Sequence, residues 1–202
     1  MLTLFHAPWS RSGRLVWLLE ELGVDYEIRY CDIPRRDGSG ARDPGNPHPD
    51  GKVPALRHDD VLVTESLAIA LYLTDLFPEA GLGAPVGSAE RGAYLTWLAW
   101  VAGELEPVLW SAISGEVARD GMAKARYDAA IARLFDALAR GPYLMGDRFT
   151  AVDIMVGSSL GWARQHVPAS DALDAYLARM GERPGNGRAT EKDGTPPAIA
   201  AA

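Results

Sequence analysis

The sequence predicts two domains of different fold class, a mixed α/β domain over residues 1–78 followed by an all-helical domain over residues 87–182. Patterns typical of strands and of helices alternate in the first part, whereas only helical periodicity continues in the second. Between them, PEAGLGAPVGS (78–88) consists mostly of Pro, Gly and Ala, which is typical of a linker. The last residues, 183–202, contain several Gly and Pro and little apolar material, which predicts a loosely ordered tail.

The first domain should fold in the order βαβ–ββα. In chain order, the patterns predict a strand at 2–7, a helix at 12–22, a strand at 25–33, a hairpin around Asp59–Asp60 and a helix at 65–77. The initial strand, helix and strand imply two parallel strands joined by a crossover helix. The hairpin adds antiparallel strands, so we expect a small mixed sheet with helices packed on it.

The second domain should consist of helices at 88–114, 122–140, 151–166 and 170–181. Pro107 should kink or interrupt the first of them, because proline cannot donate the helical hydrogen bond. Thr150 and Asp153 have the spacing of a capping box, with Asp in place of the usual Glu or Gln, and Phe149 and Ile154 are placed as its hydrophobic staple. We interpret this motif as structural.

Composition excludes several classes of protein. The 202 residues include 20 Lys and Arg against 27 Asp and Glu, so the net charge of −7 gives no basic footprint for nucleic acid. The single cysteine, Cys31, rules out an internal disulfide and a multi-cysteine metal site, and the four histidines lack ligand spacing, so we predict no metal. No apolar run reaches the roughly 18–20 residues of a membrane span, and a strand pattern rather than a signal peptide opens the chain. We expect a soluble, cytoplasmic protein without a membrane or nucleic-acid partner.

Small polar residues follow two of the predicted strands where a helix begins. Ser10, Ser12 and Gly13 precede the first helix, and TES (64–66) precedes the second, with GKVPAL (51–56) between them. In small α/β sheets, ligands bind beyond the carboxyl ends of strands and near helix N-termini, where backbone N–H groups favour anions. Hydroxyls at such positions also serve as simple helix caps. The residues alone leave both roles open.

The chain resembles the cytosolic glutathione transferase family. The resemblance lies in four stretches whose order and spacing are specific as a set: SRSGRLVWLLEELGVDYE (10–27), NPHPDGKVPAL (46–56), LVTESLAIALYL (62–73) and FTAVDIMVGSSL (149–160). It extends over about residues 1–182. It implies a thioredoxin-like N-terminal domain, an all-helical C-terminal domain, a glutathione site on the first domain, and a homodimer.

The resemblance implies that Ser10 activates the glutathione thiol, because Ser10 lies four residues before Arg14, as in serine-type members of the family. A thiol has an ordinary pKa of about 8.5, so a thiolate at neutral pH needs a drop of about 2 units, or about 2.7 kcal/mol. A hydrogen bond to a charged group supplies roughly 1.5–3 kcal/mol, and a helix N-terminus adds roughly 0.3–1 kcal/mol. These two effects suffice without a metal or a histidine. Ser12 is the competing hydroxyl, and a role for Ser10 as a simple cap is the alternative.

The resemblance also implies the residues that bind the rest of glutathione. A cis Val53–Pro54 bond would turn the Val53 N–H and C=O toward the cysteinyl backbone, and Glu65 and Ser66 would hold the γ-glutamyl ammonium and carboxylate. Further candidates are Ser12 and, for the glycine carboxylate, Lys52. For these positions the structural alternatives are an ordinary trans proline, helix caps and a solvated lysine.

Tryptophans are the candidates for an apolar pocket. Three of them lie in YLTWLAWVAGELEPVLW (94–110), where core and interface packing is the favoured role. Trp9 and Trp110 are the candidates that would line a site for a hydrophobic co-substrate. We interpret Cys31 as a small buried residue.

Together these features predict a glutathione S-transferase that conjugates the glutathione thiolate to a small hydrophobic electrophile, with glutathione as co-substrate and no cofactor. The alternatives are a glutathione-dependent peroxidase or thiol reductase, and a non-catalytic regulatory protein that binds glutathione or another ligand. A cysteine in place of Ser10 would have favoured thiol exchange. The chain departs from the family pattern at RPGNGRA (183–189), where glycines replace an aromatic residue that many relatives carry, so the packing of a last helix stays open.

Overall fold

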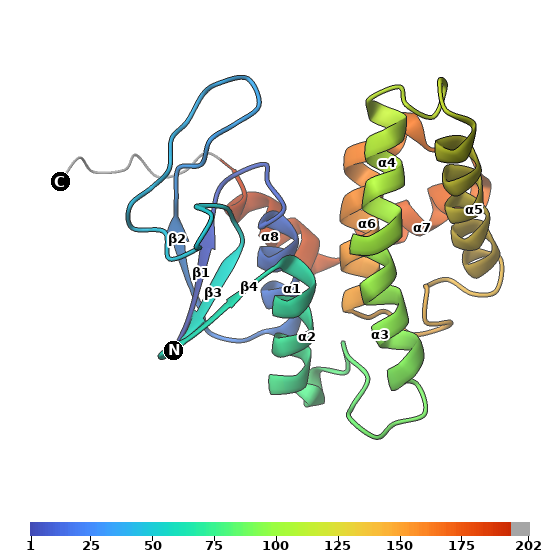
Figure 1. Ribbon diagram of the computed structural model, residues 1–202. Helices are drawn as coiled ribbons and strands as arrows, with labels where there is room; N and C mark the ends of the chain where they lie inside the picture. Colours follow the sequence, from blue (N-terminus) through green and yellow to red (C-terminus); the bar gives the residue numbers. More distant parts are fainter. Residues whose placement is uncertain (195–202) are drawn as a thin grey trace. The chain divides into compact units, whose positions relative to one another are not determined.

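The computed structural model describes residues 1–194 and has the predicted fold class, a mixed α/β domain followed by an all-helical one (Figure 1). The chain forms two compact units. The first comprises Met1–Ala80 together with the C-terminal segment from Arg183, and the second comprises Gly81–Glu182. Within the described residues, no strand follows Thr64.

The sheet of the first unit has four strands in the order β2-β1-β3-β4. The parallel pair and the hairpin follow the βαβ–ββα pattern of the sequence, since β1 pairs parallel with β2 and antiparallel with β3, and β3 pairs antiparallel with β4. The strand bounds are β1 Leu2–His6, β2 Glu27–Tyr30, β3 Ala55–His58 and β4 Val61–Thr64.

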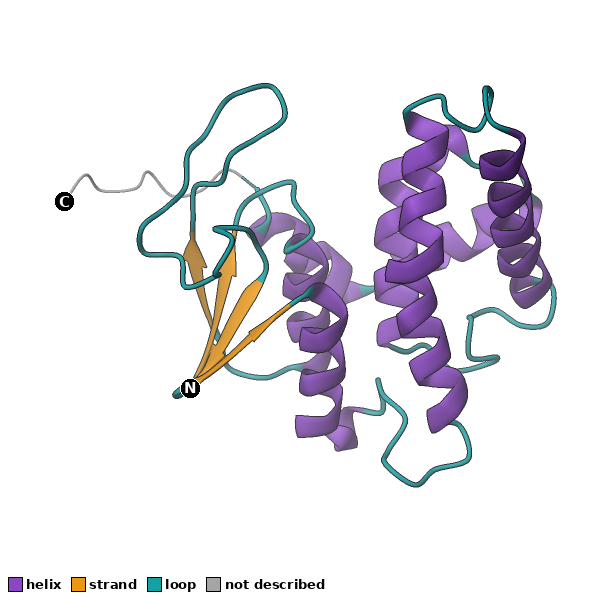
Figure 2. Ribbon diagram, in the orientation of Figure 1, coloured by secondary structure: helices purple, strands orange, loops and turns teal. Residues whose placement is uncertain are grey.

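Helices α1 (Gly13–Leu22), α2 (Ser66–Leu76) and α8 (Pro184–Lys192) gather on one face of this sheet (Figure 2). The apolar stripe predicted for α1 is buried, because Leu15, Leu18 and Leu19 are fully shielded from solvent. Burial of a leucine side chain contributes about 1.5–3 kcal/mol, so α1 is held chiefly by its apolar side.

Helix α8 corrects the expectation of a loosely ordered tail over 183–202. Residues 184–192 form a helix that packs on α1, and residues 195–202 lie outside the described part of the chain. The segment has little apolar surface, as the sequence indicated, and docks through charge instead. Arg183 pairs with Glu21 at 2.7 Å, Arg188 pairs with Glu20 at 2.7 Å, and Lys192 also pairs with Glu20.

The glycines that predicted disorder allow α8 to approach α1 closely. Gly185 is buried, and a Cβ atom at this position would lie 2.7 Å from Cδ of Glu21. A larger residue would therefore displace the carboxylate that binds Arg183. Pro184 occupies the first turn of α8, where its missing N–H costs nothing. Composition predicted flexibility here because it does not reveal close helix packing.

Glu20 is the anion at the centre of this helix contact. Its carboxylate accepts hydrogen bonds from Tyr26 (2.6 Å), Arg188 (2.7 Å) and Lys192. Burial by itself would raise the pKa of Glu20, but the hydrogen bonds from Lys192, Tyr26 and Arg188 outweigh it and lower the pKa from its ordinary 4.5 to about 2. The contact therefore stabilises the fold fully above pH 4.5 and loses that contribution as the pH falls toward 2.

We expect the variant Glu20→Gln to lower the free energy of unfolding at pH 7 by about 2 kcal/mol. This is less than the pKa shift of Glu20 alone would give, because Arg188 and Lys192 are half-exposed and solvent screens their attraction to Glu20. The difference from the unchanged protein should shrink as the pH is lowered from 4.5 to 2. Denaturant unfolding at a series of pH values measures it. Glu191→Gln is the control, an exposed carboxylate on α8, the helix that docks against Glu20. Equal losses in both variants would contradict the role given to Glu20.

The second unit consists of helices only, in agreement with the predicted class. The expected helix over 88–114 is divided by a π-helical turn at Val101–Leu105. Pro107 lies two residues after this turn and lacks the N–H that would continue the helical hydrogen bonds, so the interruption lies close to where the sequence indicated. The helices are α3 Arg91–Trp100, α4 Glu106–Ile113, α5 Gly121–Leu138, α6 Ala151–Ala163 and α7 Asp171–Gly181.

The predicted capping box begins α6. Asp153 is buried and accepts hydrogen bonds from the backbone N–H groups of Thr150 (2.8 Å) and Leu144 (2.9 Å), and from the Tyr176 hydroxyl (3.3 Å). Burial raises the pKa of Asp153, although these hydrogen bonds act in the opposite direction. The motif thus joins the start of α6 to α7 and to the preceding loop, which is a structural role as expected.

Candidate functional site

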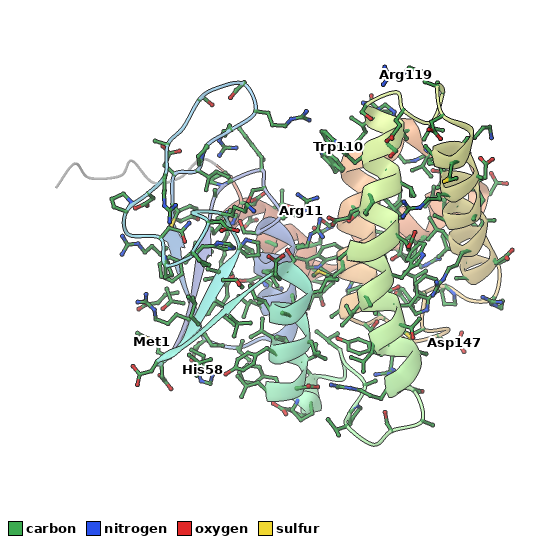
Figure 3. The ribbon with its side chains drawn as sticks, viewed as in Figure 1. Met1, Arg11, His58, Trp110, Arg119 and Asp147 are labelled. Atoms are coloured by element: carbon green, nitrogen blue, oxygen red, sulfur yellow. The ribbon has the colours of Figure 1, made fainter. Side chains whose placement is uncertain are left out.

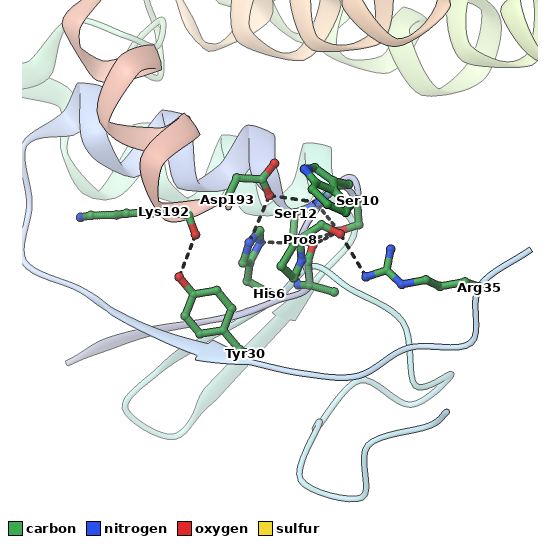
Figure 4. A network of polar contacts seen from close by, with 10 residues as sticks. His6, Pro8, Ser10, Ser12, Tyr30, Arg35, Lys192 and Asp193 are labelled. Carbon is green, nitrogen blue, oxygen red and sulfur yellow. Dashed lines mark hydrogen bonds and ion pairs between the residues drawn. The ribbon is translucent and has the colours of Figure 1, made fainter. Parts of the chain in front are cut away.

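The turn between β1 and α1 carries the two serines that the sequence singled out (Figure 4). The Ser12 hydroxyl is buried, lies 2.7 Å from Nδ1 of His6, and accepts the Ala7 N–H at 3.2 Å. The Ser10 hydroxyl is partly exposed and donates to the Ala7 carbonyl at 2.7 Å. The two Oγ atoms lie 2.7 Å apart, and the Ser12 N–H donates to Ser10 Oγ at 3.2 Å. The serines therefore form one cluster but face different surroundings.

Ser12 does not act as a simple side-chain cap, whereas Ser10 Oγ accepts a backbone N–H at the helix start. Ser12 occupies the N-cap position of α1 with helical backbone angles, and its side chain makes no capping hydrogen bond. Its carbonyl accepts the N–H groups of Leu15 (3.0 Å) and Val16 (3.2 Å). Its hydroxyl is directed to His6 instead. Ser10 is the hydroxyl of the pair that has both solvent access and a position at a helix N-terminus.

His6, the last residue of β1, and Asp193, which follows α8, are polar residues beside this turn that were not among the predicted site residues. Nε2 of the buried His6 lies 3.1 Å from Oδ1 of Asp193, which also accepts the Trp9 N–H at 3.3 Å. His6 was detectable as the last residue of a strand that leads into the serine turn. Nothing in the sequence indicated Asp193, because it lies in the segment expected to be loosely ordered.

The segment before β3 holds Lys52, Val53 and Pro54. The Val53–Pro54 peptide bond is cis, as the family resemblance implied. Val53 packs against the buried cluster of Phe5, Cys31 and Ala55. The Lys52 side chain is exposed and lies 3.2 Å from the Asp50 carboxylate, while its carbonyl accepts a hydrogen bond from the Asn46 side chain at 2.9 Å.

The turn between β4 and α2 presents Glu65 and Ser66. Glu65 is exposed, precedes the helix with φ of +68°, and makes no capping hydrogen bond with its side chain. A non-glycine residue at positive φ costs of order 1–3 kcal/mol, and such residues concentrate at functional sites. Ser66, the first residue of α2, is partly exposed. The backbone therefore directs a free carboxylate outward beside a hydroxyl at a helix N-terminus.

Strand register brings these three segments to the same end of the sheet. Phe5 near the end of β1 is paired with Ala55 at the start of β3, and Ala55 is paired with Thr64 at the end of β4. The Ser10 turn, the cis proline and Glu65–Ser66 are the segments that continue from this row. The first unit thus carries hydroxyl, carboxylate and backbone hydrogen-bonding groups along one edge.

The two tryptophans proposed for an apolar pocket belong to different units. Trp9 lies in the serine turn with φ of +55° and is 81% exposed. Trp110 lies on α4 (Figure 3) and stacks on Trp162 of α6, with ring centroids 6.1 Å apart and both rings partly exposed. By contrast, Trp97 and Trp100 are buried against each other and against Arg133, which is the packing role favoured for this helix.

Thiol and metal chemistry have little support from this chain's own side chains. Cys31 is buried, as predicted, and burial raises the pKa of its thiol to about 11. Among residues 1–194, no group of three or more His, Cys, Asp or Glu side chains is arranged to hold a metal ion. No helix in this part of the chain has the length and apolar character needed to cross a bilayer.

Comparison with known proteins gives the same assignment for both units. Residues 8–76 match the family model of the glutathione S-transferase N-terminal domain, and residues 98–179 match that of the C-terminal domain. The chain is 29% identical to the glutathione S-transferase GstA of Escherichia coli O157:H7 over 187 residues, which cover 90% of this chain and 93% of the relative. It is 27% identical to the disulfide-bond oxidoreductase YfcG of E. coli K12, with 95% of each chain covered.

A solved structure agrees with these relatives. The crystal structure of a glutathione transferase from Methylococcus capsulatus superposes with a TM-score of 0.81 at 34% identity, covering 96% of this chain and 99% of that one. The similarity spans both the sheet domain with its three site segments and the helical domain. The chain therefore belongs to the glutathione S-transferase family.

Proposed function

We propose that this protein is an enzyme, a glutathione transferase that joins the thiolate of glutathione to a small hydrophobic electrophile. The Ser10 hydroxyl carries the proposal, because it is a partly exposed donor at the N-terminus of α1. In the structure this hydroxyl donates to the Ala7 carbonyl. A rotation about its Cβ–Oγ bond redirects the proton toward a bound sulfur, while Oγ stays in place and the Ser12 N–H continues to donate to it.

The free energy that the Ser10 hydrogen bond and the N-terminus of α1 supply is similar to the free energy needed to ionise the bound thiol. Converting most of the bound thiol to thiolate at neutral pH needs about 2.7 kcal/mol. A hydroxyl donating to a charged sulfur supplies roughly 1.5–3 kcal/mol, and the positive end of α1 supplies roughly 0.3–1 kcal/mol. The thiolate then attacks the electrophilic carbon and forms a sulfur–carbon bond. An aromatic halide releases halide with its electron pair, whereas an unsaturated carbonyl gives an enolate that takes up a proton from water. No redox step occurs, and no metal is needed to lower the pKa of the thiol.

The remaining groups bind the peptide. Glu65 pairs with the γ-glutamyl ammonium, and the Ser66 hydroxyl and the N–H groups at the N-terminus of α2 donate to the γ-glutamyl carboxylate. The Val53 backbone pairs with the cysteinyl N–H and C=O, and Lys52 pairs with the glycine carboxylate. Trp9, in the same turn as Ser10, is the aromatic side chain proposed to contact the electrophile. Its exposure supports this role, because a buried ring could not reach a ligand.

The proposal includes a cytoplasmic homodimer. The first unit supports the dimer with exposed apolar residues on one hairpin strand and the following helix, namely Val61 and Leu62 on β4 and Leu76 on α2.

Glutathione-dependent disulfide reduction is the second candidate, because a relative named disulfide-bond oxidoreductase matches over 95% of the chain. Such a reaction would use only glutathione thiols here, since Cys31 is buried and has a raised pKa. A panel of turnover assays distinguishes the two candidate reactions. Glutathione is supplied with an aromatic halide, an unsaturated carbonyl, a hydroperoxide or a small disulfide. We expect turnover with the first two substrates, the aromatic halide and the unsaturated carbonyl. Turnover with the last two alone would favour reduction, and tight glutathione binding without turnover would indicate a regulatory binding protein.

The variant Ser10→Ala should raise the pKa of the bound glutathione thiol by about 1–2 units, since it removes a hydrogen bond of roughly 1.5–3 kcal/mol to the thiolate. The rate at neutral pH should fall accordingly and recover at higher pH. Ser12→Ala should shift this pKa less and lower stability by about 1–3 kcal/mol, because it leaves Nδ1 of buried His6 without its partner. Thiolate absorbance against pH measures the first effect and denaturant unfolding the second. A larger pKa shift in Ser12→Ala would reverse the two roles.

The variants Glu65→Ala and Ser66→Ala should raise KM for glutathione with little change in kcat, because the γ-glutamyl group is held equally in the ground and transition states. Loss of one charged contact of about 1.5–3 kcal/mol corresponds to a roughly 10- to 150-fold weaker affinity for Glu65→Ala. Calorimetric titration with glutathione measures this change. Glu79→Ala, in the same unit but outside the three site segments, is the control. Unchanged affinity in both site variants would refute their assignment.

A further inference from the structure

A polar chain leads from the C-terminal segment to the Ser10 hydroxyl. Asp193 Oδ1 lies 3.1 Å from His6 Nε2, His6 Nδ1 lies 2.7 Å from Ser12 Oγ, and Ser12 Oγ lies 2.7 Å from Ser10 Oγ (Figure 4). Two of these four residues, Ser10 and Ser12, belong to the proposed thiol site. The other two residues, His6 and Asp193, have no part in the function proposed above.

The middle of this chain is shielded from solvent. His6 and Ser12 are each 0% exposed. From β2, the ring of Tyr30 faces His6 edge-on at 5.5 Å, and the Tyr30 hydroxyl donates to the Lys192 carbonyl at 2.7 Å. Asp193 contacts the imidazole through its carboxylate, 3.1 Å from Nε2. Charges and hydrogen bonds act more strongly in such a low-dielectric interior than in water.

The carboxylate of Asp193 is held at the start of α1 by more than one contact. Its Oδ1 accepts the Trp9 N–H, and the N-terminus of a helix favours a negative charge. Gly13 leaves the necessary space, because a Cβ atom there would lie 3.0 Å from Asp193 Oδ1. Helix α8 carries Asp193 to this position through the ion pairs with Glu20 and Glu21.

The protons of the chain decide whether Ser10 is free to act. A carboxylate only accepts, so His6 Nε2 carries a proton when it faces Asp193. If Nδ1 is unprotonated, it accepts the Ser12 proton, and Ser12 Oγ then competes for the proton of Ser10. If the imidazole is a cation, Nδ1 donates to Ser12, and the Ser12 proton is directed to Ser10 Oγ or the Ala7 carbonyl.

We propose that Asp193 is a positioning residue for the Ser10 hydroxyl, acting through His6 and Ser12 to direct the Ser10 proton toward the sulfur of glutathione. The inference rests on the proposed function of Ser10. It assigns the C-terminal segment a part in thiol activation, although this segment lies more than 180 residues from Ser10 in the sequence. The negative charge of Asp193 would by itself raise the pKa of a nearby thiol. The proposed positioning of the Ser10 proton lowers that pKa, so the two effects of Asp193 have opposite signs.

This opposition of signs gives a direct test with Asp193→Ala, compared with Lys192→Ala as the matched control. Lys192→Ala weakens the docking of α8 at Glu20 but keeps Asp193. Thiolate absorbance against pH is recorded for the glutathione complex of each protein, together with kcat and KM for glutathione. We expect Asp193→Ala to raise the pKa of the bound thiol by about 0.5–1 unit, to lower kcat at neutral pH, and to change KM less. Lys192→Ala should leave the thiol titration unchanged.

The thiol pKa of the unchanged protein distinguishes a failure of this inference from a failure of the proposed function. If its bound thiol has the ordinary pKa, the proposed function itself is refuted. If that pKa is lowered and Asp193→Ala leaves it unchanged or lowers it further, the role of Asp193 is refuted. An equal rise in Lys192→Ala would also refute it, because the docking of α8 would then be the cause. Gly13→Ala provides a second route should Asp193→Ala fail to fold: displacing the carboxylate should raise the pKa in the same direction, and an unchanged titration would overturn the proposal.

Discussion

The pairing of Phe5 with Ala55 and of Ala55 with Thr64 is the constraint on which the site depends. Because adjacent strands are fixed opposite one another, the segments that leave these three positions start at one end of the sheet. A shift of one residue in either pair would turn every side chain of the shifted strand to the opposite face. The buried residues of β1 and β3, Leu4 and Leu56 among them, set this register through the core. Packing of the sheet thereby determines which polar groups become neighbours.

Charge takes the place of apolar packing where the C-terminal segment joins the first unit. Helix α8 buries Gly185 and Ala189 but few large side chains, so area burial offers it little stability. Glu20, with its pKa lowered to about 2, and Glu21 supply the attraction, and Gly185 provides the close approach. Such contacts have more directional geometry than apolar ones, because each hydrogen bond fixes an angle as well as a distance. They therefore suit a segment that must place one carboxylate, Asp193, beside one imidazole.

The sequence predicted the fold class, the strand–helix order, the cis proline and the capping box at Thr150, because each leaves a local pattern in the chain or belongs to the family resemblance. It did not predict α8. Gly and Pro in RPGNGRA indicate disorder when only local propensity is considered, whereas the structure uses them for close helix packing and for a helix start. It also did not find His6 or Asp193. A contact between residues 6 and 193 depends on tertiary packing, and no periodicity records it.

Ser10 and Ser12 are two residues that the sequence cannot distinguish and the structure can. Both are hydroxyls within three residues of the same helix start, so residue type and spacing give them equal standing. Burial distinguishes them, since Ser12 is enclosed with His6 and Ser10 has access to solvent. A buried hydroxyl must satisfy its hydrogen bonds within the protein, and Ser12 does so with His6, Ala7 and Ser10. The partly exposed hydroxyl can exchange its partner at little cost, and this freedom is what a donor to an incoming thiolate requires.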